Sequence, residues 1–290
     1  MTQRLGCAFL CITQPEEETE RNQAETSANA EISRIQPVAA PVVGLEIHAQ
    51  ISSRTKLFSR AVSLPDSPVN HNVSYFDCAL PGTLPVLNRR CVDAGILTAL
   101  ALQCQISPWS DFDRKHYFYA DLPAGYQITQ HFHPIAVDGT IEYIVYDRQS
   151  NLDAVVKRTK IVQIQLEQDS GKSLHDLKQW TTYVDLNRCG VGLMEIVTDH
   201  NLSNGLEASC LVKELAATLK AAGTCELRVD ANISVHKPNE VLRCRTEVKN
   251  LNSFRFLRHA VDYEIARHIH VYESGEEVTN ETRSFDPMTG

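Results

Sequence analysis

The sequence predicts an α+β protein built on a largely antiparallel sheet. Three segments carry apolar residues at helical spacing, and five others alternate between apolar and polar residues, as strands with one buried face do. The chain has 290 residues, 43% of them hydrophobic, so it is long enough to bury a substantial core. These observations indicate one large domain or two closely packed lobes.

The first 36 residues differ in composition from the rest of the chain. Residues 13–33 contain six glutamates, few apolar residues and no periodicity, so residues 1–36 are predicted to form a disordered arm. Mitochondrial presequences are basic and poor in acidic residues, so only residues 1–12 could belong to one. From Pro37 onward the composition is globular, and residues 37–290 are expected to form the folded unit.

The three predicted helices are marked by apolar residues three or four positions apart, at 92–100, 212–222 and 254–265. Ser203 is expected to cap the second helix and Gly223 to end it. The predicted strands cover 43–50, 141–146, 160–167, 227–235 and 243–250.

Alternation along a strand also predicts which side chains share a face. Glu46 and His48 are expected side by side in the first strand, with Cα atoms about 7 Å apart. In 160–167, alternation places Val162 in the core and Glu167 on the opposite face. In one sheet these faces would combine into a polar surface, formed by Glu46, His48, Glu167, Asp230 and Glu247, interleaved with Arg228, Arg245 and Lys249.

This surface has a definite chemical use, because carboxylates and an imidazole suit Mg²⁺ or Mn²⁺. The metal and nearby cations would neutralise nucleotide phosphates during phosphoryl transfer. Glu46, His48 and Glu167 are the predicted metal ligands, and Asp230 and Glu247 are further catalytic carboxylates. An ordinary solvated sheet face would show the same alternation, so alternation alone leaves both interpretations open.

Other polar segments allow two interpretations as well. Arg114 and Lys115 precede an aromatic stretch, which suits either a nucleotide or a partly buried loop. Asp169 and Lys172 flank a turn that resembles a phosphate or metal loop, or a plain charged hairpin. Arg188 could pair with phosphate or with a carboxylate.

Eight segments in fixed order are more specific than any single pattern. They are VGLEIHAQ (43–50), LPGTLPVLN (80–88), DRKHYFYADLPAGYQITQ (113–130), LEQDSGK (166–172), DLNRCGVGLMEIV (185–197), LRVDANISV (227–235), EVKNLNSFR (247–255) and ETRSFD (281–286). From residue 42 to residue 290 the chain resembles the B subunit of the aspartyl/glutamyl-tRNA amidotransferases, and within that family its eukaryotic, mitochondrial members.

The resemblance implies a fold related to the glutamine synthetase and guanidino kinase group, in which an antiparallel sheet forms a cradle around ATP and Mg²⁺ (or Mn²⁺). The implied activity is a carbon–nitrogen ligase of the glutaminyl-tRNA synthase (glutamine-hydrolysing) type, active only as part of a heterotrimer with the A and C subunits of the amidotransferase. The γ-carboxylate of glutamate on tRNA(Gln) would be phosphorylated, and ammonia from the A subunit would displace the phosphate, because a free carboxylate is a poor electrophile. The implied location is the mitochondrial matrix.

The residues predicted to bind ATP or substrate are Arg114, Lys115, Asp169, Lys172, Arg188, Arg228, Lys249, Asn250 and Ser253. The chain departs from the family pattern at Ala124, at residues 199–201 and in the short join 223–227. The family's C-terminal helical and tail domains are expected to be absent after residue 290. A truncated, non-catalytic isoform that binds the A and C subunits is therefore one alternative, and a stand-alone phosphotransferase acting on a small carboxylic acid is another.

Charge and composition set further expectations. The net charge of -8 argues against tight tRNA binding by this chain alone, because phosphate contacts need clustered Lys and Arg. No apolar run approaches the roughly 20 residues needed to span a membrane.

The nine cysteines include no C-x-x-C pair, which favours a reducing compartment. No glutaminase motif is present, so nitrogen must come from a partner or from free ammonia. The preference between Glu-tRNA(Gln) and Asp-tRNA(Asn) stays open.

Overall fold

The centre of the protein is an eight-stranded sheet with strand order β12-β11-β10-β1-β9-β6-β5-β2. The computed structural model describes residues 39–64, 67–147, 153–222, 224–237, 240–251 and 253–286. Neighbouring strands are antiparallel throughout the sheet except for the parallel pair β11 and β12. The predicted α+β class and largely antiparallel sheet are confirmed, whereas the relation to the glutamine synthetase and guanidino kinase group stays a prediction.

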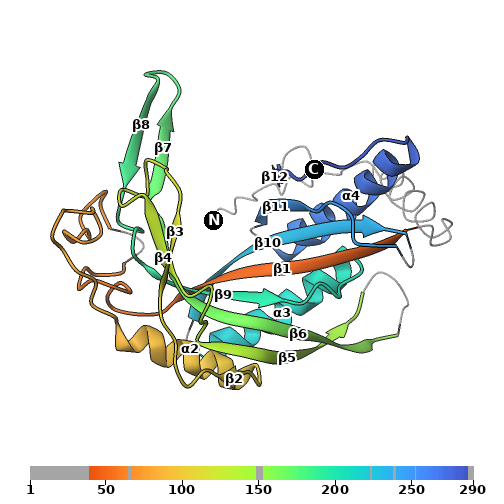
Figure 1. Cartoon of the computed structure of the whole chain (residues 1–290), viewed down its shortest axis with the longest axis horizontal. Coiled ribbons are helices and arrows are strands. Elements are labelled where there is room, and N and C mark those ends of the chain that lie inside the picture. The colour runs from red at the N-terminus through yellow and green to blue at the C-terminus, as the bar shows by residue number, and fades with distance from the viewer. Residues whose placement is uncertain are drawn as a thin grey trace, which may run out of the picture.

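The long strands lie in the middle of the sheet. They are β1 (Ala40–Ile51), β5 (Ala136–Val145), β6 (Val155–Gln168), β9 (Gly192–Thr198) and β10 (Thr224–His236). Three shorter strands lie toward the two ends of the sheet. β2 (Gln105–Ile106) is one edge strand, and β11 (Thr246–Leu251) lies next to the other edge strand, β12 (Thr282–Ser284). Two hairpins rise beside the sheet (Figure 1), one from β3 (Asp113–His116) and β4 (Tyr126–Thr129), the other from β7 (Lys172–Asp176) and β8 (Thr181–Asp185).

Within the described ranges, the helices are α2 (Arg89–Ala101), α3 (Gly205–Ala221) and α4 (Phe254–Glu273). Each matches one of the three predicted helical segments, although α3 ends one residue before the predicted segment 212–222 does. All three helices contribute side chains to the hydrophobic core behind the sheet. Asn204, one residue beyond the predicted Ser203, caps α3 by accepting a hydrogen bond from the Glu207 backbone N–H. The predicted helix stop Gly223 and the predicted disordered arm 1–36 lie outside the described residues.

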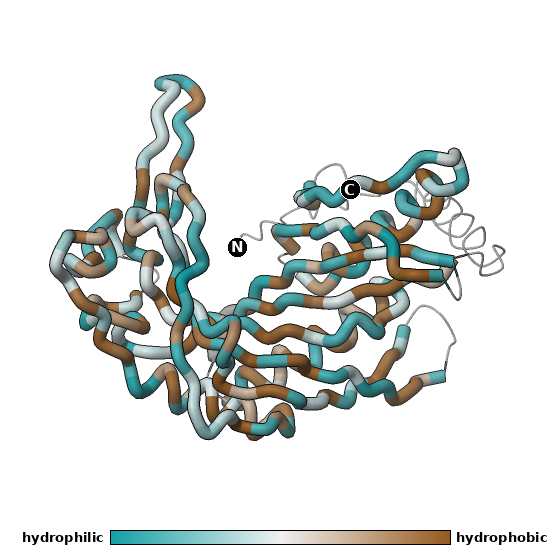
Figure 2. The backbone as a smooth tube through the Cα atoms, in the orientation of Figure 1, coloured by the Kyte–Doolittle hydropathy of each residue, from teal (hydrophilic) through white to brown (hydrophobic). Residues whose placement is uncertain are grey.

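The buried face of the sheet follows the predicted alternation in β1 and β10. Val43, Leu45 and Ile47 on β1 belong to the core, as do Val229 and Ala231 on β10. Figure 2 shows hydrophobic and hydrophilic positions alternating along these strands. We call the sheet face opposite the helices the open face, because it carries the polar side chains of the central strands.

One prediction about β6 is wrong. Val162 was expected in the core, but it is 40% exposed, whereas Ile161 is fully buried. The cause is an irregularity in the pairing of β6 with β9 between Ile161 and Gln163, which behaves as a β-bulge. Alternation resumes at Ile164, so Glu167 still points to the open face as predicted.

Helices α3 and α4 approach each other closely at Gly205. A Cβ atom at this position would lie 2.1 Å from the carbonyl oxygen of Arg258, so only glycine fits without a shift of the backbone. The Gly205 backbone N–H also donates to Asp262 Oδ1 at 2.7 Å. None of the helices in the described part of the chain combines the length and apolar composition needed to cross a membrane.

A buried ionic cluster joins α4 to β11 and to the edge strand β12. Glu264 accepts hydrogen bonds from Thr246 Oγ1 at 2.7 Å and from the Arg267 guanidinium at 2.6 Å, and Arg283 Nε on β12 lies 3.5 Å from its other oxygen. Burial acts to raise the pKa of Glu264, but hydrogen bonds from His268, Arg267 and Thr246 hold it well below its usual value. This cluster fixes β11, the strand that carries Glu247 and Lys249.

Candidate metal centre

Three ionisable side chains meet in the middle of the open face. His48 lies on β1, Glu195 on β9 and Glu167 on β6. Because β9 lies between the other two strands, Glu195 is directly opposite His48 on one side and opposite Gln165 on the other. One ligand atom from each of the three residues lies within 4.8 Å of the other two. His48 Nε2 is 3.4 Å from Glu167 Oε1. We call His48, Glu167 and Glu195 the central cluster.

Hydrogen bonds from neighbouring side chains fix both carboxylates of the central cluster. Thr129 on β4 donates its hydroxyl to Glu167 Oε2 at 3.0 Å. Gln165 donates its amide to Glu195 Oε2 at 2.5 Å and to Thr129 Oγ1 at 3.1 Å. Glu167 and Glu195 are only 2% and 8% exposed. The carboxylates are therefore held in place, with second partners of the kind that orient metal ligands.

Burial and the charges of neighbouring groups shift the pKa values of the three side chains in different ways. Burial, followed by the charge of Glu167, raises the pKa of Glu195 to about 7. Burial acts to raise the pKa of Glu167 as well, but the hydrogen bond and charge of His48 lower it below its usual value. Burial acts against a charged His48, yet its hydrogen bond with Glu167 and the nearby carboxylates raise its pKa.

The donor set of the central cluster fits a divalent cation. Two carboxylates and one imidazole within reach of one another match the hard oxygen ligands, with one nitrogen, that Mg²⁺ and Mn²⁺ accept. The raised pKa of Glu195 means that two buried carboxylates cannot both ionise easily without added positive charge. A divalent cation would supply that charge, so the residues present fit the predicted metal.

The other predicted carboxylates lie around this cluster. Glu46 is on the same face of β1, but its Oε1 accepts a hydrogen bond from Asn232 at 2.8 Å, and it is outside the group of three. Asp230 lies opposite Glu46, with its Oδ2 atom 3.9 Å from His48 Nδ1, and burial raises its pKa. Glu247 on β11 is farther out and pairs with Lys249 at 3.3 Å. Their catalytic roles stay predictions.

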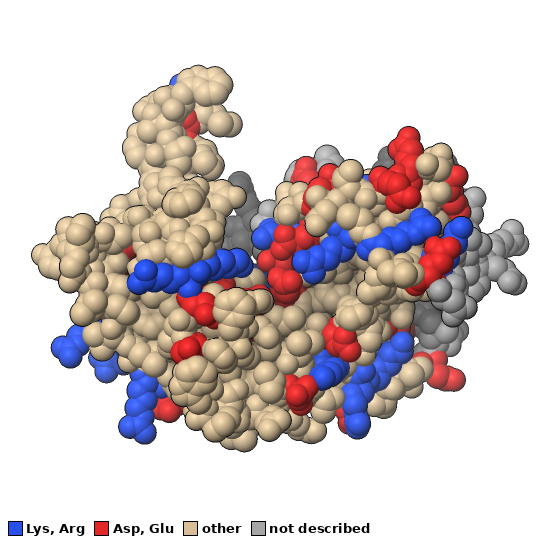
Figure 3. All heavy atoms as spheres, viewed as in Figure 1, with Lys and Arg blue, Asp and Glu red and all other residues tan. Residues whose placement is uncertain are grey.

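Several predicted cations lie at the rim of the open face. Figure 3 shows Lys and Arg side chains close to Asp and Glu side chains across this side of the molecule. Lys115 on β3 is exposed, and its charge acts on both Glu167 and Glu195. Arg114 lies over the ring of Tyr126 at 4.5 Å. Lys172 is exposed at the start of β7.

Asp169 takes part in a buried ionic arrangement rather than facing solvent. It is 4% exposed, and the Arg228 guanidinium contacts both its oxygens, at 2.6 Å and 3.3 Å. Arg188 lies 3.5 Å from Asp169 and donates to the carbonyl of Gly171 at 2.6 Å. These contacts hold the turn between β6 and β7 against β10. The predicted binding of ATP or substrate by Asp169, Arg188 and Arg228 stays a prediction.

The last two predicted binding residues lie near the start of α4. Ser253 caps this helix, accepting a hydrogen bond from the Phe256 backbone N–H at 3.1 Å. Asn250 belongs to β11, and its side chain lies outside the described part of the structure.

The alternation pattern did not reveal Glu195 or Thr129. Strand β9 is nearly buried on both faces, so GLMEIVT reads as a continuous apolar run interrupted by one glutamate. A charged residue inside such a run was the available signal, because burying a carboxylate is costly unless it has partners. Thr129 gave no comparable signal, since its contact with Glu167 depends on how β4 packs against β6.

Comparison with known proteins places these residues in a family. The family model described as "GatB/GatE catalytic domain" matches residues 41–290. The chain is 58% identical over 262 residues to the mitochondrial B subunit of glutamyl-tRNA(Gln) amidotransferase from Danio rerio, a match that covers 88% of this chain and 47% of that protein. It is equally similar, at 58% over 258 residues, to the Homo sapiens protein of the same name, covering 87% of this chain and 46% of that protein.

A bacterial relative gives a similar result. The B subunit of the aspartyl/glutamyl-tRNA(Asn/Gln) amidotransferase from Rickettsia typhi is 49% identical over 252 residues, covering 84% of this chain and 51% of that protein. The chain thus spans about half the length of the curated relatives it matches.

Proposed function

The chain belongs to the GatB/GatE catalytic domain family, and from this premise we propose that its open face carries out the ATP-dependent step of a glutamyl-tRNA(Gln) amidotransferase. The central cluster carries the proposal. A solvated sheet face would leave its charged residues exposed, whereas Glu167 and Glu195 are buried, hydrogen-bonded and gathered with His48 around one point.

In the proposed reaction an oxygen of the glutamyl γ-carboxylate forms a bond to the γ-phosphorus of ATP, and the bond from that phosphorus to the ADP oxygen breaks. The nitrogen of ammonia then forms a bond to the activated acyl carbon, and phosphate leaves with the electron pair of the C–O bond. A proton is lost from the attacking nitrogen, which leaves the amide of Gln-tRNA(Gln). Phosphorylation is needed because carboxylate oxygen is a poor leaving group.

The chain's own residues would hold the cation and position the phosphates. His48, Glu167 and Glu195 would bind Mg²⁺ or Mn²⁺, which when bound supplies positive charge to phosphoryl oxygens. Thr129 keeps Glu167 oriented through the hydrogen bond described above. Lys115, exposed at the rim and electrostatically coupled to the cluster, would contact phosphate oxygens.

Partners and location follow from the same proposal. The names of the animal relatives refer to Glu-tRNA(Gln), to a B subunit and to mitochondria. We therefore propose that this chain acts in the mitochondrial matrix, in a complex with the A and C subunits of the amidotransferase, where the A subunit supplies ammonia. Similarity at 58% to proteins named for Glu-tRNA(Gln) favours that substrate over Asp-tRNA(Asn). The intact central cluster supports a catalytic role over a purely structural one.

The test is ATP-dependent formation of Gln-tRNA(Gln) by the full chain combined with the A and C subunits. Glu167→Gln removes one charge of the central cluster but keeps its shape, and it should abolish product formation and weaken Mn²⁺ binding. Glu142→Gln is the matched control, because Glu142 is an exposed carboxylate on β5 paired with Arg158. Wild-type turnover by the Glu167 variant would remove the cluster from the mechanism.

A further inference from the structure

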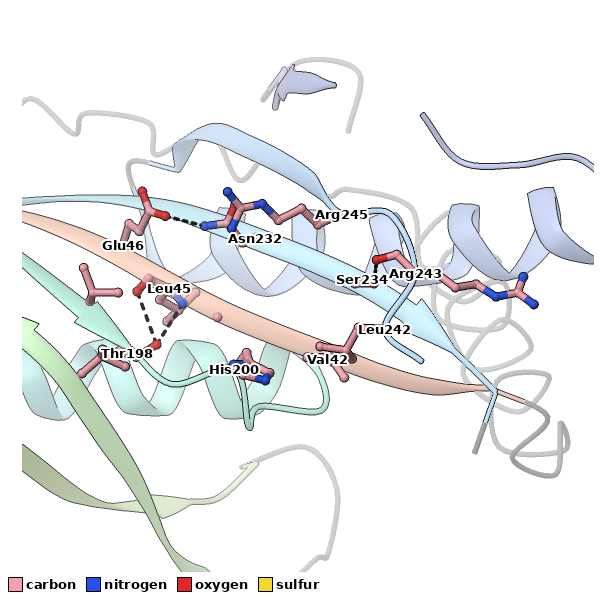
Figure 4. Close-up of a pocket in the computed structure, with 13 residues that line it drawn as sticks. Val42, Leu45, Glu46, Thr198, His200, Asn232, Ser234, Leu242, Arg243 and Arg245 are labelled. Carbon is pink, nitrogen blue, oxygen red and sulfur yellow. Dashed lines mark hydrogen bonds between the residues drawn. The ribbon is translucent and has the colours of Figure 1, made fainter. Parts of the chain in front are cut away.

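The hairpin of β7 and β8 lies apart from the candidate site. That site includes a hollow of about 380 Å³ on the open face, lined by Glu46, Asn232 and their neighbours (Figure 4). No residue of the hairpin lines this hollow. In Figure 1 the hairpin projects away from the sheet. Only Lys172, at its start, is among the predicted binding residues.

The hairpin contributes little to the core of the protein. No residue from 172 to 185 is buried. The hairpin of β3 and β4 differs, because Ile128 and Thr129 of β4 are buried. A two-stranded hairpin without buried side chains gains little stability of its own.

The base of the projecting hairpin is nevertheless fixed to the body. Asn70 donates its side-chain amide to the Val184 carbonyl at 3.0 Å and accepts a hydrogen bond from the Leu186 backbone N–H at 2.7 Å. The Gly171 backbone N–H donates to the Asp121 carbonyl at 2.8 Å. The direction of the hairpin is thus set at its base, which presents the tip at a defined place.

The turn at the tip is ordered by its own hydrogen bonds. Asp176 accepts hydrogen bonds from the backbone N–H groups of Lys178 and Gln179, at 2.9 Å and 3.1 Å. Thr181 donates its hydroxyl to the Gln179 carbonyl at 3.0 Å. An ordered turn loses less conformational entropy when a partner binds it, which favours binding.

Two large apolar side chains lie on this turn without cover. Leu177 is 79% exposed and Trp180 is 92% exposed. A tryptophan buries about 150–250 Å² when a partner covers it. Tryptophan is also enriched among the residues that dominate binding energy at protein interfaces. The tip therefore has the composition of a protein-binding anchor.

The backbone at Trp180 favours a role outside the fold as well. Its φ of 52° lies in the left-handed region, which glycine, asparagine and aspartate adopt at low cost and a bulky aromatic residue does not. Folding alone would thus favour asparagine or glycine at this position. Backbone strain at a residue outside the core is typical of a binding site.

The charge of the hairpin favours a protein partner over a nucleic acid. Residues 172–185 contain two lysines and two aspartates, so their formal net charge is zero with His175 neutral. Binding RNA through its phosphates needs clustered Lys and Arg. An apolar pocket in a protein accepts an uncharged aromatic side chain and an aliphatic one.

The size of the tip favours a different subunit over a second copy of this chain. A specific interface buries about 800 Å² on each partner, far more than two touching turns supply. Insertion of the tip into a pocket elsewhere on a second copy is a heterologous contact, which repeats into rings or filaments. A partner that also lies against the body of the protein supplies the remaining area.

We propose that the tip of the β7–β8 hairpin docks into an apolar pocket of a partner subunit of the amidotransferase, an inference that rests on the proposed function. Trp180 fills the pocket, Leu177 packs beside it, and the hydrogen-bonded turn holds both in position. Because β7 follows β6 after a short turn, the docked hairpin also ties the partner to the strand that carries Glu167.

The first test measures assembly of the full chain with the A and C subunits by calorimetric titration. Trp180→Asn removes the ring and suits the left-handed backbone, so its melting temperature should equal or exceed that of wild type. Its affinity for the A and C subunits should fall about tenfold or more. Lys178→Gln, an exposed change on the same turn, is the matched control and should keep its affinity within about twofold of wild type.

A fluorine label follows the docking directly. The chain contains two tryptophans, Trp109 and Trp180, so fluorotryptophan incorporated into this chain alone gives two resonances. Trp109→Phe identifies the resonance of Trp180. When the A and C subunits are added, this resonance should shift and lose its solvent isotope shift, because the indole leaves water. A Trp180 resonance that keeps its free position in the assembled complex would overturn the inference.

The outcomes separate the inference from the proposed function. Equal affinity of Trp180→Asn and wild type for the A and C subunits, or a lower melting temperature of the variant, would overturn the docking site and leave the central cluster untouched. If wild type bound neither subunit, the proposed function itself would fail. Weaker Glu-tRNA(Gln) binding by both variants with unchanged assembly would assign the tip to RNA. Self-association of wild type that Trp180→Asn abolishes would assign it to a second copy, and either result would overturn the inference.

Discussion

Replacing Glu195 by Gln should stabilise the metal-free protein while weakening its metal binding. The pKa of Glu195 is raised to about 7 by burial and by Glu167, against 4.5 for the unfolded side chain. Above pH 7 the buried charge therefore costs the metal-free fold about 3 kcal/mol. Glutamine has the same shape and can still accept the hydrogen bond from Gln165, so the variant should gain up to this amount.

The pH dependence has a definite sign. Between pH 4.5 and about 7 the folded wild type binds a proton at Glu195 that the unfolded chain has lost. This group's contribution to stability therefore decreases as pH rises through that window. The variant cannot titrate at this position, so its advantage over wild type should grow from pH 5 to pH 8. Metal binding requires the ionised carboxylate, so Mn²⁺ affinity of the wild type should fall about tenfold from pH 8 to pH 6.

The assay is urea unfolding of the full chain with EDTA at pH 5, 6, 7 and 8, together with calorimetric Mn²⁺ titration. The variant should be more stable at pH 8 and should bind Mn²⁺ more than about tenfold more weakly. Glu142→Gln is the control and should change stability by less than about 0.5 kcal/mol. A Glu195 variant that is no more stable at pH 8 and binds Mn²⁺ like wild type would refute the reasoning.

Three further predictions concern residues that support the site. Thr129→Val removes the hydroxyl that donates to Glu167. Its Mn²⁺ affinity should fall about tenfold, while the free energy of unfolding should fall by only about 1 kcal/mol. Unchanged Mn²⁺ affinity would mean that the hydroxyl does not orient the carboxylate. Asp169→Asn removes the buried carboxylate charge that the partly exposed Arg228 guanidinium contacts. This variant should lower the free energy of unfolding, measured in urea, by about 1.5 kcal/mol, and a neutral effect would contradict the ionic anchoring of the β6–β7 turn. Glu264 has a lowered pKa, so its contribution to folding stability is present above the unfolded pKa and is lost as pH falls below about 4.5. Glu264→Gln should be less stable than wild type at pH 7, and its stability, followed by circular dichroism, should fall less steeply on acidification. A pH–stability curve parallel to that of wild type would exclude Glu264 as a source of acid sensitivity.

The sequence alone determined the main strands and part of the site. In β1 and β10 a strict two-residue period places Glu46, His48, Asp230 and Asn232 on one face. A shift by one residue would have buried these polar groups, so the pattern could be read without the fold. The eight ordered segments also sufficed to identify the family, which the match to residues 41–290 confirms.

Only the tertiary structure decided which residues meet. Alternation places Glu167 on the open face, but it does not say that β9 inserts between β1 and β6 and brings Glu195 next to His48. Pairing of strands distant in sequence depends on how whole faces pack, and a strand buried on both sides carries no alternation to reveal its orientation. For the same reason the bulge that turns Val162 outward became visible only once β6 was paired with β9.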